Sequence, residues 1–385
     1  MHIALPIEWI SRELDSKLLL ICHLIKNSKK KNLKILFGSQ KLLGKYLSSK
    51  KFSPYVWVAS GVDQQQEAYF NLIKNGGVFT SLDEEGAIFT KHEEENFPRH
   101  LRGIKYAKLI TRLYIWGKKE FYKFKKEYKR KSKKTLVLSG NPRFDLASTK
   151  YKKYHFSKNK KVNVLINAAF GTSNSDISFY DEKIFWISRS INSKFYEKID
   201  LLEPIYKYQK KNFYPFLSDI KKLVTKYPKV IFGLRCHPAE NILVYKNFFR
   251  NIKNIKILYN SQSVLYNIFN SDILIHNGCT TAIENSISNK ISICHINFRN
   301  KKYEQYLPVK ISHNSSNFLE LDKLFCKYIK KNHNTQTRYK KILHELKGYI
   351  SNLNNSSSGI ISKNLLSIKL KNELQLKRNL IHNKE

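Results

Sequence analysis

Short, uninterrupted apolar runs alternate along the chain with longer segments in which apolar residues recur every three or four positions. An unbroken apolar run is typical of a strand that is buried on both faces, whereas the longer period is typical of an amphipathic helix. The predicted strands comprise residues 3–7, 33–37, 56–59, 78–82, 113–116, 135–138, 162–166, 230–234, 255–258, 273–275 and 291–296. The predicted helices include residues 14–25, 40–47, 64–73, 118–128, 216–224 and 264–269. Strands separated by helices indicate βαβ units, and therefore an α/β fold with parallel sheets.

The alternation occurs in two series, separated by a polar, Lys-rich stretch at 151–161. We therefore predict an N-terminal Rossmann-like domain at 1–145 and a second one at 146–335, with a cleft between the carboxyl edges of their sheets. From about residue 336 to residue 385 the pattern is basic and helical, without strands. Residues 168–212 fit neither period, and we expect an irregular and helical insertion there.

Basic residues greatly outnumber acidic ones. The 385 residues include 70 Lys and Arg against 30 Asp and Glu, which gives a net charge of +40. Anionic partners are compatible with this excess. Basic residues are spread along the whole chain, however, which favours a solvated Lys-rich surface over a nucleic-acid patch, so we expect no nucleic-acid partner.

Five scattered cysteines, without a C-x-x-C pair, predict reduced thiols rather than disulfides or a structural zinc site. The first residues lack a basic leader with an apolar core, and no apolar run approaches the ~18 residues needed to span a bilayer. We expect a cytoplasmic protein that contacts membranes only peripherally. Residues 365–381 are amphipathic enough to lie on a membrane surface, although a helix packed on the protein body is the more common arrangement.

One stretch, 271–285, combines a strand, a turn and a helix start. The turn falls at Asn277 and Gly278, and the helix is predicted to begin with Thr280 and Thr281. Free backbone N–H groups, two hydroxyls and the positive end of the helix dipole make this point a candidate phosphate site. The alternative is an ordinary helix cap on a structural βα unit.

A second candidate follows the strand at 230–234. His237 precedes Pro238, which restricts the backbone, and Arg235 supplies a neighbouring cation. Such a histidine can donate to a phosphate oxygen or protonate a leaving phosphate. A structural histidine is the alternative.

Three further side chains suit a nucleotide. Glu284, one turn into the predicted helix, can accept from two ribose hydroxyls, unless it faces solvent or caps the helix. Asn141 and Arg143 flank a proline and offer an amide and a guanidinium to phosphate or carboxylate.

Carboxylates in the first half supply candidate bases. Glu8, Glu13 and Asp15 follow the first strand, and Glu84 follows a later one. Transfer of a sugar to a hydroxyl needs a carboxylate as base, or as nucleophile when the anomeric configuration is retained. We select Glu8 and Glu84, with His237, as catalytic candidates. For Glu13 and Asp15 the favoured interpretation is a charge on a helix surface.

Together these motifs resemble the bacterial surface carbohydrate biosynthesis proteins. The resemblance covers roughly residues 1–300, with LPIE at 5–8, RELDSKLLL at 12–20, DEEG at 83–86, GNPRFD at 140–145, RCHP at 235–238 and HNGCTTAIE at 276–284. Those proteins are similar to GT-B glycosyltransferases that use CMP-activated acidic sugars, including capsule and lipopolysaccharide Kdo transferases and sialyltransferases. Cys279 departs from the pattern, because a serine is common at that place.

The resemblance implies a role for each second-half motif. His237 would bind or protonate the CMP phosphate, Thr280 and Thr281 would hold it, and Glu284 would bind the ribose. Arg235 would pair with the sugar carboxylate. The first domain would then serve the acceptor and the second the nucleotide sugar.

The sequence therefore predicts a metal-independent GT-B glycosyltransferase without a cofactor, which moves Kdo or a nonulosonic acid from CMP to a glycan or lipid-linked glycan. A CDP-glycerol or UDP-sugar transferase, or a sugar-nucleotide epimerase, is the alternative among enzymes. The alternative outside enzymes is a basic protein that binds nucleic acid or anionic lipid, with an affinity that falls steeply with salt.

Overall fold

The chain forms two compact domains. The computed structural model describes residues 1–29, 32–49, 54–61, 77–84, 86, 89–91, 110–127, 135–155, 162–190, 196–259, 262–330, 336–353 and 356–370. The first domain comprises Met1–Ala87, Glu95–Ser148 and Leu343–Glu385, and the second comprises Ile88–Glu94 and Thr149–Ile342. The chain thus changes domain at 148/149 and 342/343, where the sequence pattern placed the limits at 145/146 and 335/336. The described residues between 343 and 370 belong to the first domain, where the sequence pattern predicted a separate helical segment.

The first domain contains a six-stranded parallel sheet. Its strands are β1 (His2–Ile7), β2 (Lys34–Ser39), β3 (Tyr55–Ala59), β4 (Val78–Leu82), β5 (Ile110–Ile115) and β6 (Leu136–Leu138). Its helices include α1 (Ile10–Asn27), α2 (Gln40–Ser49), α5 (Lys118–Glu127), α7 (Pro142–Ala147) and α17 (Ser357–Leu366). The strand order is β2-β1-β3-β4-β5-β6, so the chain reverses its direction of travel across the sheet between β1 and β3. Ligands bind at such a switch point in open α/β sheets.

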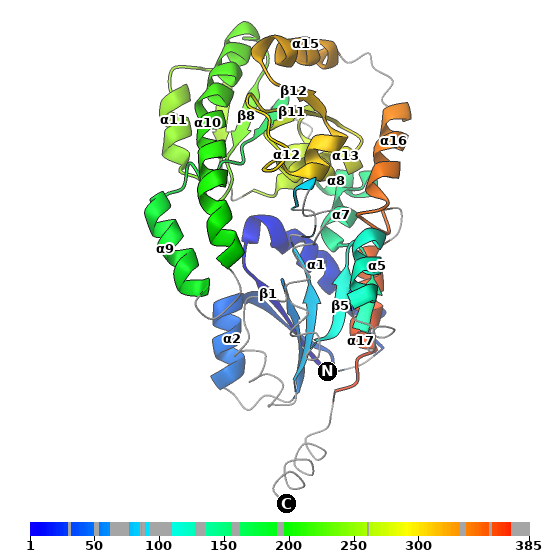
Figure 1. Cartoon of the computed structure of the whole chain (residues 1–385). Coiled ribbons are helices and arrows are strands. Elements are labelled where there is room, and N and C mark those ends of the chain that lie inside the picture. Colours follow the sequence, from blue (N-terminus) through cyan, green and yellow to red (C-terminus); the bar gives the residue numbers. More distant parts are fainter. Residues whose placement is uncertain are drawn as a thin grey trace, which may run out of the picture. The chain divides into compact units, whose positions relative to one another are not determined.

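Both faces of this sheet are covered. On one face Ala4, Trp57 and Phe79 pack with Leu43 of α2 and Phe124 of α5. The other face is covered by α1 and α17, as the contacts of alternate strand residues with these helices show. In Figure 1 the red α17 lies with the blue and cyan elements of the first domain. Burial of both faces explains the continuous apolar runs in the sequence.

α17 is held to the first domain by a buried carboxylate. Asp145, in α7, accepts hydrogen bonds from the backbone N–H groups of Ser357 (2.9 Å) and Ser358 (2.8 Å) and from the Ser358 hydroxyl (2.7 Å). Burial raises the pKa of Asp145, and these hydrogen bonds oppose the shift. The N-cap of α17 is Ser356, whose hydroxyl accepts from the Gly359 N–H. The carboxylate thus satisfies N–H groups that the first turn of a helix leaves without partners.

The second domain contains another six-stranded parallel sheet, in the order β12-β11-β10-β7-β8-β9. Its strands are β7 (Val164–Asn167), β8 (Phe232–Arg235), β9 (Ile255–Leu258), β10 (Ile273–His276), β11 (Ile291–His295) and β12 (His313–Ser315). Its helical elements include η2 (Thr149–Tyr151), α8 (Lys152–His155), α9 (Phe179–Ser190), α10 (Tyr196–Lys226), α11 (Ile242–Phe249), α12 (Val264–Phe269), α13 (Thr281–Ile287), α14 (Tyr306–Ile311) and α15 (Phe318–Ile329). α16 (Gln336–Leu346) contains the second domain limit. The switch point of this sheet lies between β7 and β10.

The insertion predicted at 168–212 is largely helical. α10 runs for 31 residues and contains Pro204 and Pro215, and Figure 1 shows it as the long green helix of this domain. Its C-terminal half contributes Phe216, Leu217 and Ile220 to the core. Proline removes a backbone hydrogen bond and interrupts the apolar period, which explains why the sequence pattern did not reveal one long helix.

The predicted strands correspond to eleven of the observed ones, and β12 was not predicted. The helix predicted at 64–73 lies outside the described residues, as do residues 156–161 of the predicted connection and 371–381 of the amphipathic tail. Among the helices that the structure describes, none is long and apolar enough to cross a membrane.

Candidate functional site

The candidate phosphate site lies at the switch point of the second sheet. β7 and β10 are parallel neighbours, with Asn167 beside His276 at their carboxyl ends. Two hydrogen bonds join the segments that follow: Asn167 Nδ2 donates to Thr281 Oγ1 (2.8 Å), and Asn277 Nδ2 donates to the Ala169 carbonyl (3.2 Å). The two segments therefore form one connected surface at the edge where ligands bind in such sheets.

The Gly278 turn is held by a buried histidine. Gly278 has a φ of +99°, a left-handed conformation that favours glycine. Its N–H donates to His276 Nδ1 (3.0 Å), and His276 Nε2 lies 2.9 Å from the Ser312 hydroxyl, which donates to the Pro308 carbonyl. Burial lowers the pKa of His276 to about 3, so the ring is neutral and accepts at Nδ1. This role of His276 was not predicted from the sequence.

Thr280 and Thr281 have different environments. Thr281 is buried, and its hydroxyl is engaged by Asn167 and lies 3.2 Å from Cys279 Sγ. Thr280 is partly exposed and precedes α13, but its side chain makes no capping hydrogen bond. Glu284 is fully buried in the first turn of α13. Thr280 is thus the more accessible hydroxyl of the pair, and contacts of these residues with phosphate and ribose stay predictions.

The His-Pro loop is organised by Glu240. This buried carboxylate accepts from the backbone N–H groups of Phe170 and His237 (3.2 Å for the latter) and from the Tyr245 hydroxyl (2.7 Å). Burial raises its pKa to about 7, while the three donors act to lower it. Glu240 therefore ties the segment after β8 to the segment after β7. It lies two residues after the RCHP motif, and its role needs contacts that spacing does not reveal.

His237 itself is exposed. Its Nδ1 accepts from the Ala239 N–H (3.2 Å), which places the proton of the neutral ring on Nε2. A Cβ atom at Gly171 would lie 3.3 Å from that same Nδ1, so the glycine allows the close approach of the two segments. Arg235 ends β8 and is buried, and Pro238 is partly exposed. The predicted motifs at 235–238 and 276–284 thus lie at the carboxyl ends of β8 and β10, beside the segment that follows β7.

A cluster of buried charges lies where β1, β3 and β4 of the first domain end. Glu13 is fully buried, and Lys17 is 2% exposed. Lys17 Nζ lies 3.0 Å from Glu13 Oε2 and 3.9 Å from Glu84 Oε1. It also donates to the Pro6 carbonyl, and it lies 3.4 Å from the Ser60 hydroxyl. One cation is thus shared by two carboxylates at the switch point of the first sheet. The interpretation of Glu13 as a surface charge is wrong.

The pKa values of the two buried carboxylates, Glu13 and Glu84, are shifted in opposite directions. Burial acts to raise the pKa of Glu13, but Lys17 and Arg12 outweigh it and hold the pKa below its usual value. Burial raises the pKa of Glu84 to about 7, and the charge on Glu13 adds to this effect. Glu84 Oε2 has no hydrogen-bond partner among the described residues. Neighbouring carboxylates with separated pKa values are typical of sites at which a proton is held.

Glu8 is the exposed member of this group. It follows β1 directly, and its N–H donates to Glu13 Oε2 (3.2 Å). Partial desolvation raises the pKa of Glu8, and the Glu13 carboxylate raises it further. Of the two catalytic carboxylates predicted from sequence, Glu8 can therefore meet a substrate, whereas Glu84 is 2% exposed.

Asn141 and Arg143 lie in the first domain. Asn141 is fully buried: its Oδ1 accepts from the Arg143 N–H (2.9 Å), and its Nδ2 donates to the Asp83 carbonyl (2.9 Å). It caps α7 and fixes the loop that carries Glu84. The Arg143 side chain is close enough to lower the pKa of Glu84. This geometry gives Asn141 a structural function, and a nucleotide contact of Arg143 stays a prediction.

Replacing Glu84 by glutamine is expected to change how stability depends on pH. The pKa of Glu84 is about 7 in the folded protein against 4.5 in the unfolded chain, so the folded state binds the proton more tightly. The protonated Glu84 therefore contributes its full stabilisation below pH 4.5, and this stabilisation is lost as the pH rises from 4.5 through 7. Between pH 5 and 8 the free energy of unfolding of the wild type should therefore fall by on the order of 3 kcal/mol more than that of Glu84→Gln. Urea unfolding at several pH values measures this, with Asp15→Asn as the control. Parallel curves for wild type and Glu84→Gln would contradict the assignment.

Among the described residues, no group of three or more His, Cys, Asp or Glu side chains is arranged to hold a metal ion. The groups that face the two switch points are a histidine, hydroxyls, backbone amides, cationic side chains and carboxylates.

The two parallel-sheet domains define a GT-B-like fold. No family model matches the sequence, and no curated protein does. Among solved structures, the wall teichoic acid polymerase TagF, in a variant soaked with CDPG, is similar, with a TM-score of 0.56 and 12% identity over 99% of this chain and 89% of that one. The UDP-GlcNAc 2-epimerase of Neisseria meningitidis, bound to UDP-GlcNAc, gives a TM-score of 0.55 and 13% identity over 96% of this chain and 100% of that one. The UDP-GlcNAc 2-epimerase of Methanocaldococcus jannaschii, in complex with UDP-GlcNAc and UDP, gives a TM-score of 0.50 and 13% identity over 90% of this chain and 98% of that one. At these identities the likeness shows the fold.

Proposed function

We propose that this protein is a glycosyltransferase of surface glycan biosynthesis, which transfers an acidic sugar such as Kdo or a nonulosonic acid from CMP to a glycan acceptor. One observation carries the proposal: the His-Pro loop and the Gly278 turn lie at or beside the switch point of one sheet, tied to the segment after β7 through Glu240, Asn167 and Asn277. A cradle of backbone amides and hydroxyls with a histidine suits the phosphate of a nucleotide.

The second domain would bind the donor. His237, an exposed residue that carries the proton of its neutral ring on Nε2, would donate to the departing phosphate, and Thr280 would hydrogen-bond to that phosphate. Glu284 would take the ribose hydroxyls, and Arg235 the carboxylate of the sugar. Donors that face developing negative charge stabilise the transition state more than the ground state.

The first domain would supply the base. An acceptor hydroxyl oxygen attacks the anomeric carbon, the bond from that carbon to the phosphate oxygen breaks, and CMP leaves with the electron pair. The hydroxyl proton passes to Glu8, whose raised pKa brings it closer to neutral pH. Glu13, Lys17 and Glu84 would hold the charge distribution around Glu8 and fix the start of α1.

Direct titration with nucleotides tests the proposal. By calorimetry, CMP should bind more tightly than UDP, and His237→Ala should weaken CMP binding about tenfold by removing one charge-assisted donor. His344→Ala, which removes an exposed histidine of α16, should leave the affinity unchanged. A preference for UDP, or no preference among CMP, CDP and UDP, would remove the CMP assignment.

Two alternatives use the same fold and follow from the ligands named for the similar structures, CDPG and UDP-GlcNAc. A CDP-glycerol transferase would favour CDP in the titration, and an epimerase would convert a UDP-sugar without any acceptor. Product analysis with and without a glycan acceptor separates transfer from epimerisation. For a CMP-sugar transferase of capsule or lipopolysaccharide synthesis, we propose a cytoplasmic location at the inner face of the membrane, where a lipid-linked acceptor is reached by peripheral contact.

A further inference from the structure

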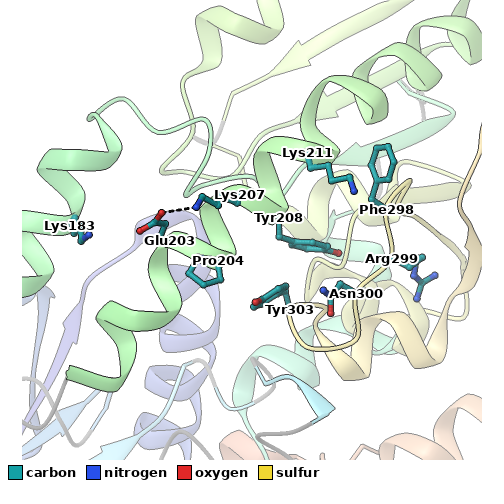
Figure 2. A pocket seen from close by; sticks show the side chains of 10 residues that line it. All are labelled: Lys183, Glu203, Pro204, Lys207, Tyr208, Lys211, Phe298, Arg299, Asn300 and Tyr303. Atoms are coloured by element: carbon teal, nitrogen blue, oxygen red, sulfur yellow. Dashed lines mark ion pairs between the residues drawn. The ribbon is translucent and has the colours of Figure 1, made fainter.

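A pocket of about 640 Å³ lies in the second domain, and none of its lining residues belongs to the motifs that the sequence singled out. It is formed by α9, α10 and the loop after β11, and Figure 2 shows its lining side chains. They are Lys183, Glu203, Pro204, Lys207, Tyr208, Lys211, Phe298, Arg299, Asn300 and Tyr303. Its volume is in the range that holds small ligands.

The loop that forms one wall is held in place by buried polar groups. Asn212 of α10 accepts from the Phe298 N–H (2.8 Å) and donates back to the Phe298 carbonyl (3.2 Å). Asn297 donates to Asp219 (2.7 Å), which also lies 3.1 Å from His295 Nε2. Asn212, Asp219 and His295 are each less than 9% exposed. Buried hydrogen bonds of this kind hold the backbone in one conformation, so the wall is fixed before a ligand arrives.

Glu304 fixes the charged part of the same wall. This buried carboxylate accepts from Arg299 Nε (3.0 Å) and from the second terminal nitrogen of Arg299 (2.7 Å), and also from the Asn300 N–H (2.6 Å). The paired guanidinium is therefore held in one orientation, with about a third of the side chain exposed. The pocket thus combines preordered groups with exposed lysines.

The lining combines rings and cations. The Tyr208 and Tyr303 rings lie 5.5 Å apart at 41°, and Lys211 Nζ lies 4.3 Å from the centre of the exposed Phe298 ring. Four lining side chains are cationic and one, Glu203, is acidic; it pairs with Lys207 at 2.8 Å (Figure 2). Rings bind the apolar faces of a ligand, and the excess of cations attracts negative charge.

We propose that this pocket binds an acidic carbohydrate, whose ring faces rest on Tyr208 and Tyr303 and whose carboxylates meet Lys207, Lys211 and Arg299. Resting on the proposed function, this names the acceptor class: a glycan that already carries acidic sugars. It also assigns part of acceptor binding to the second domain, where the resemblance implied the first. None of the lining residues belongs to the segments at 235–240 or 276–284. The loop after β11 also reaches the Gly278 turn, because a Cβ atom at Gly278 would lie 4.0 Å from Gln305. The pocket is therefore a second subsite beside the one proposed for the nucleotide.

Calorimetry on the full chain with saturating CMP tests this. Trigalacturonic acid is the acidic probe, maltotriose the uncharged one, and inorganic phosphate tests for a simple anion. We expect trigalacturonic acid to bind at least tenfold more tightly than either of the others, with an affinity that falls as salt rises. The double variant Lys207→Gln/Lys211→Gln should weaken binding of trigalacturonic acid about tenfold. The matched pair Lys210→Gln/Lys221→Gln makes the same charge change on α10 outside the pocket and should leave it unchanged.

The aromatic contact has its own test. Tyr303→Ala should weaken binding several-fold, whereas Tyr303→Phe should retain it, because the ring and not the hydroxyl contacts the sugar. Equal affinity for phosphate and the acidic sugar, equal effects of the two lysine pairs, or competition by CMP would overturn the proposal. Its failure is separable from that of the proposed function: loss of CMP binding in His237→Ala with glycan binding intact affects only the donor site.

Discussion

Glu8→Gln is expected to lower kcat by about 10² to 10⁴, with little change in KM for the donor, because the amide cannot accept the acceptor proton in the transition state. Glu8 is exposed at the end of β1, so its replacement removes no core contact and the folded protein should be obtained in normal yield. Release of CMP from a CMP-activated acidic sugar in the presence of acceptor measures the rate.

The pH profile adds a second readout for the same residue. A base must be deprotonated, so kcat/KM of the wild type should fall as pH drops through the pKa of Glu8, which desolvation and Glu13 raise above its usual value. Asp15→Asn, a carboxylate change on the neighbouring helix α1, should keep both the rate and this acid limb. A Glu8→Gln enzyme within threefold of wild type would assign the base to another group.

Lys17→Met is expected to destabilise the protein by about 3–5 kcal/mol, the largest loss that we expect for a single substitution in the first domain. Lys17 is the cation shared by Glu13 and Glu84, and each of the three side chains is at most 2% exposed. Without the ammonium, two carboxylates remain buried beside each other, and one must bind a proton or leave the interior. Urea unfolding at neutral pH measures the loss.

Two further variants keep this prediction informative. Lys26→Met, at an exposed position of the same helix, should change the free energy of unfolding by less than about 0.5 kcal/mol. Lys17→Met/Glu84→Gln should recover part of the loss, because only one buried carboxylate remains. If Lys17→Met cannot be obtained folded while the double variant can, the charge imbalance is still the cause; a loss below about 1 kcal/mol for Lys17→Met would show that the cluster contributes little.

The sheet strands were the most predictable part of the structure, because burial on both faces leaves an unbroken apolar run that few other elements produce. The placement of RCHP and HNGCTTAIE at the carboxyl edge follows from the same reasoning, since each motif directly follows such a run. β12, with the sequence HNS, has no apolar signature and takes its strand form from pairing with β11.

Other features depend on contacts between distant residues. Glu13 resembles any helix-surface glutamate until Lys17, Ser60 and Glu84 are placed around it, and Ser60 is 47 residues away. The pocket of the second domain combines a proline-interrupted helix with a loop about 90 residues later, for which no local pattern exists. Glu240 lies two residues after the RCHP motif, yet its role in joining that loop to Phe170 depends on a tertiary contact.

The packing of α17 on the first domain, held by Asp145, affects the order in which the two domains can fold during synthesis. The first domain needs residues from 356 onward to cover β1 and α1, and these are translated after the whole second domain. On the ribosome, the second domain can therefore complete its core first, while the sheet face that α1 and α17 share stays only partly covered until α17 emerges. The N-terminal part of the chain is thus synthesised first but completes its native contacts last, and its exposed apolar surface is the part that chaperones are expected to bind.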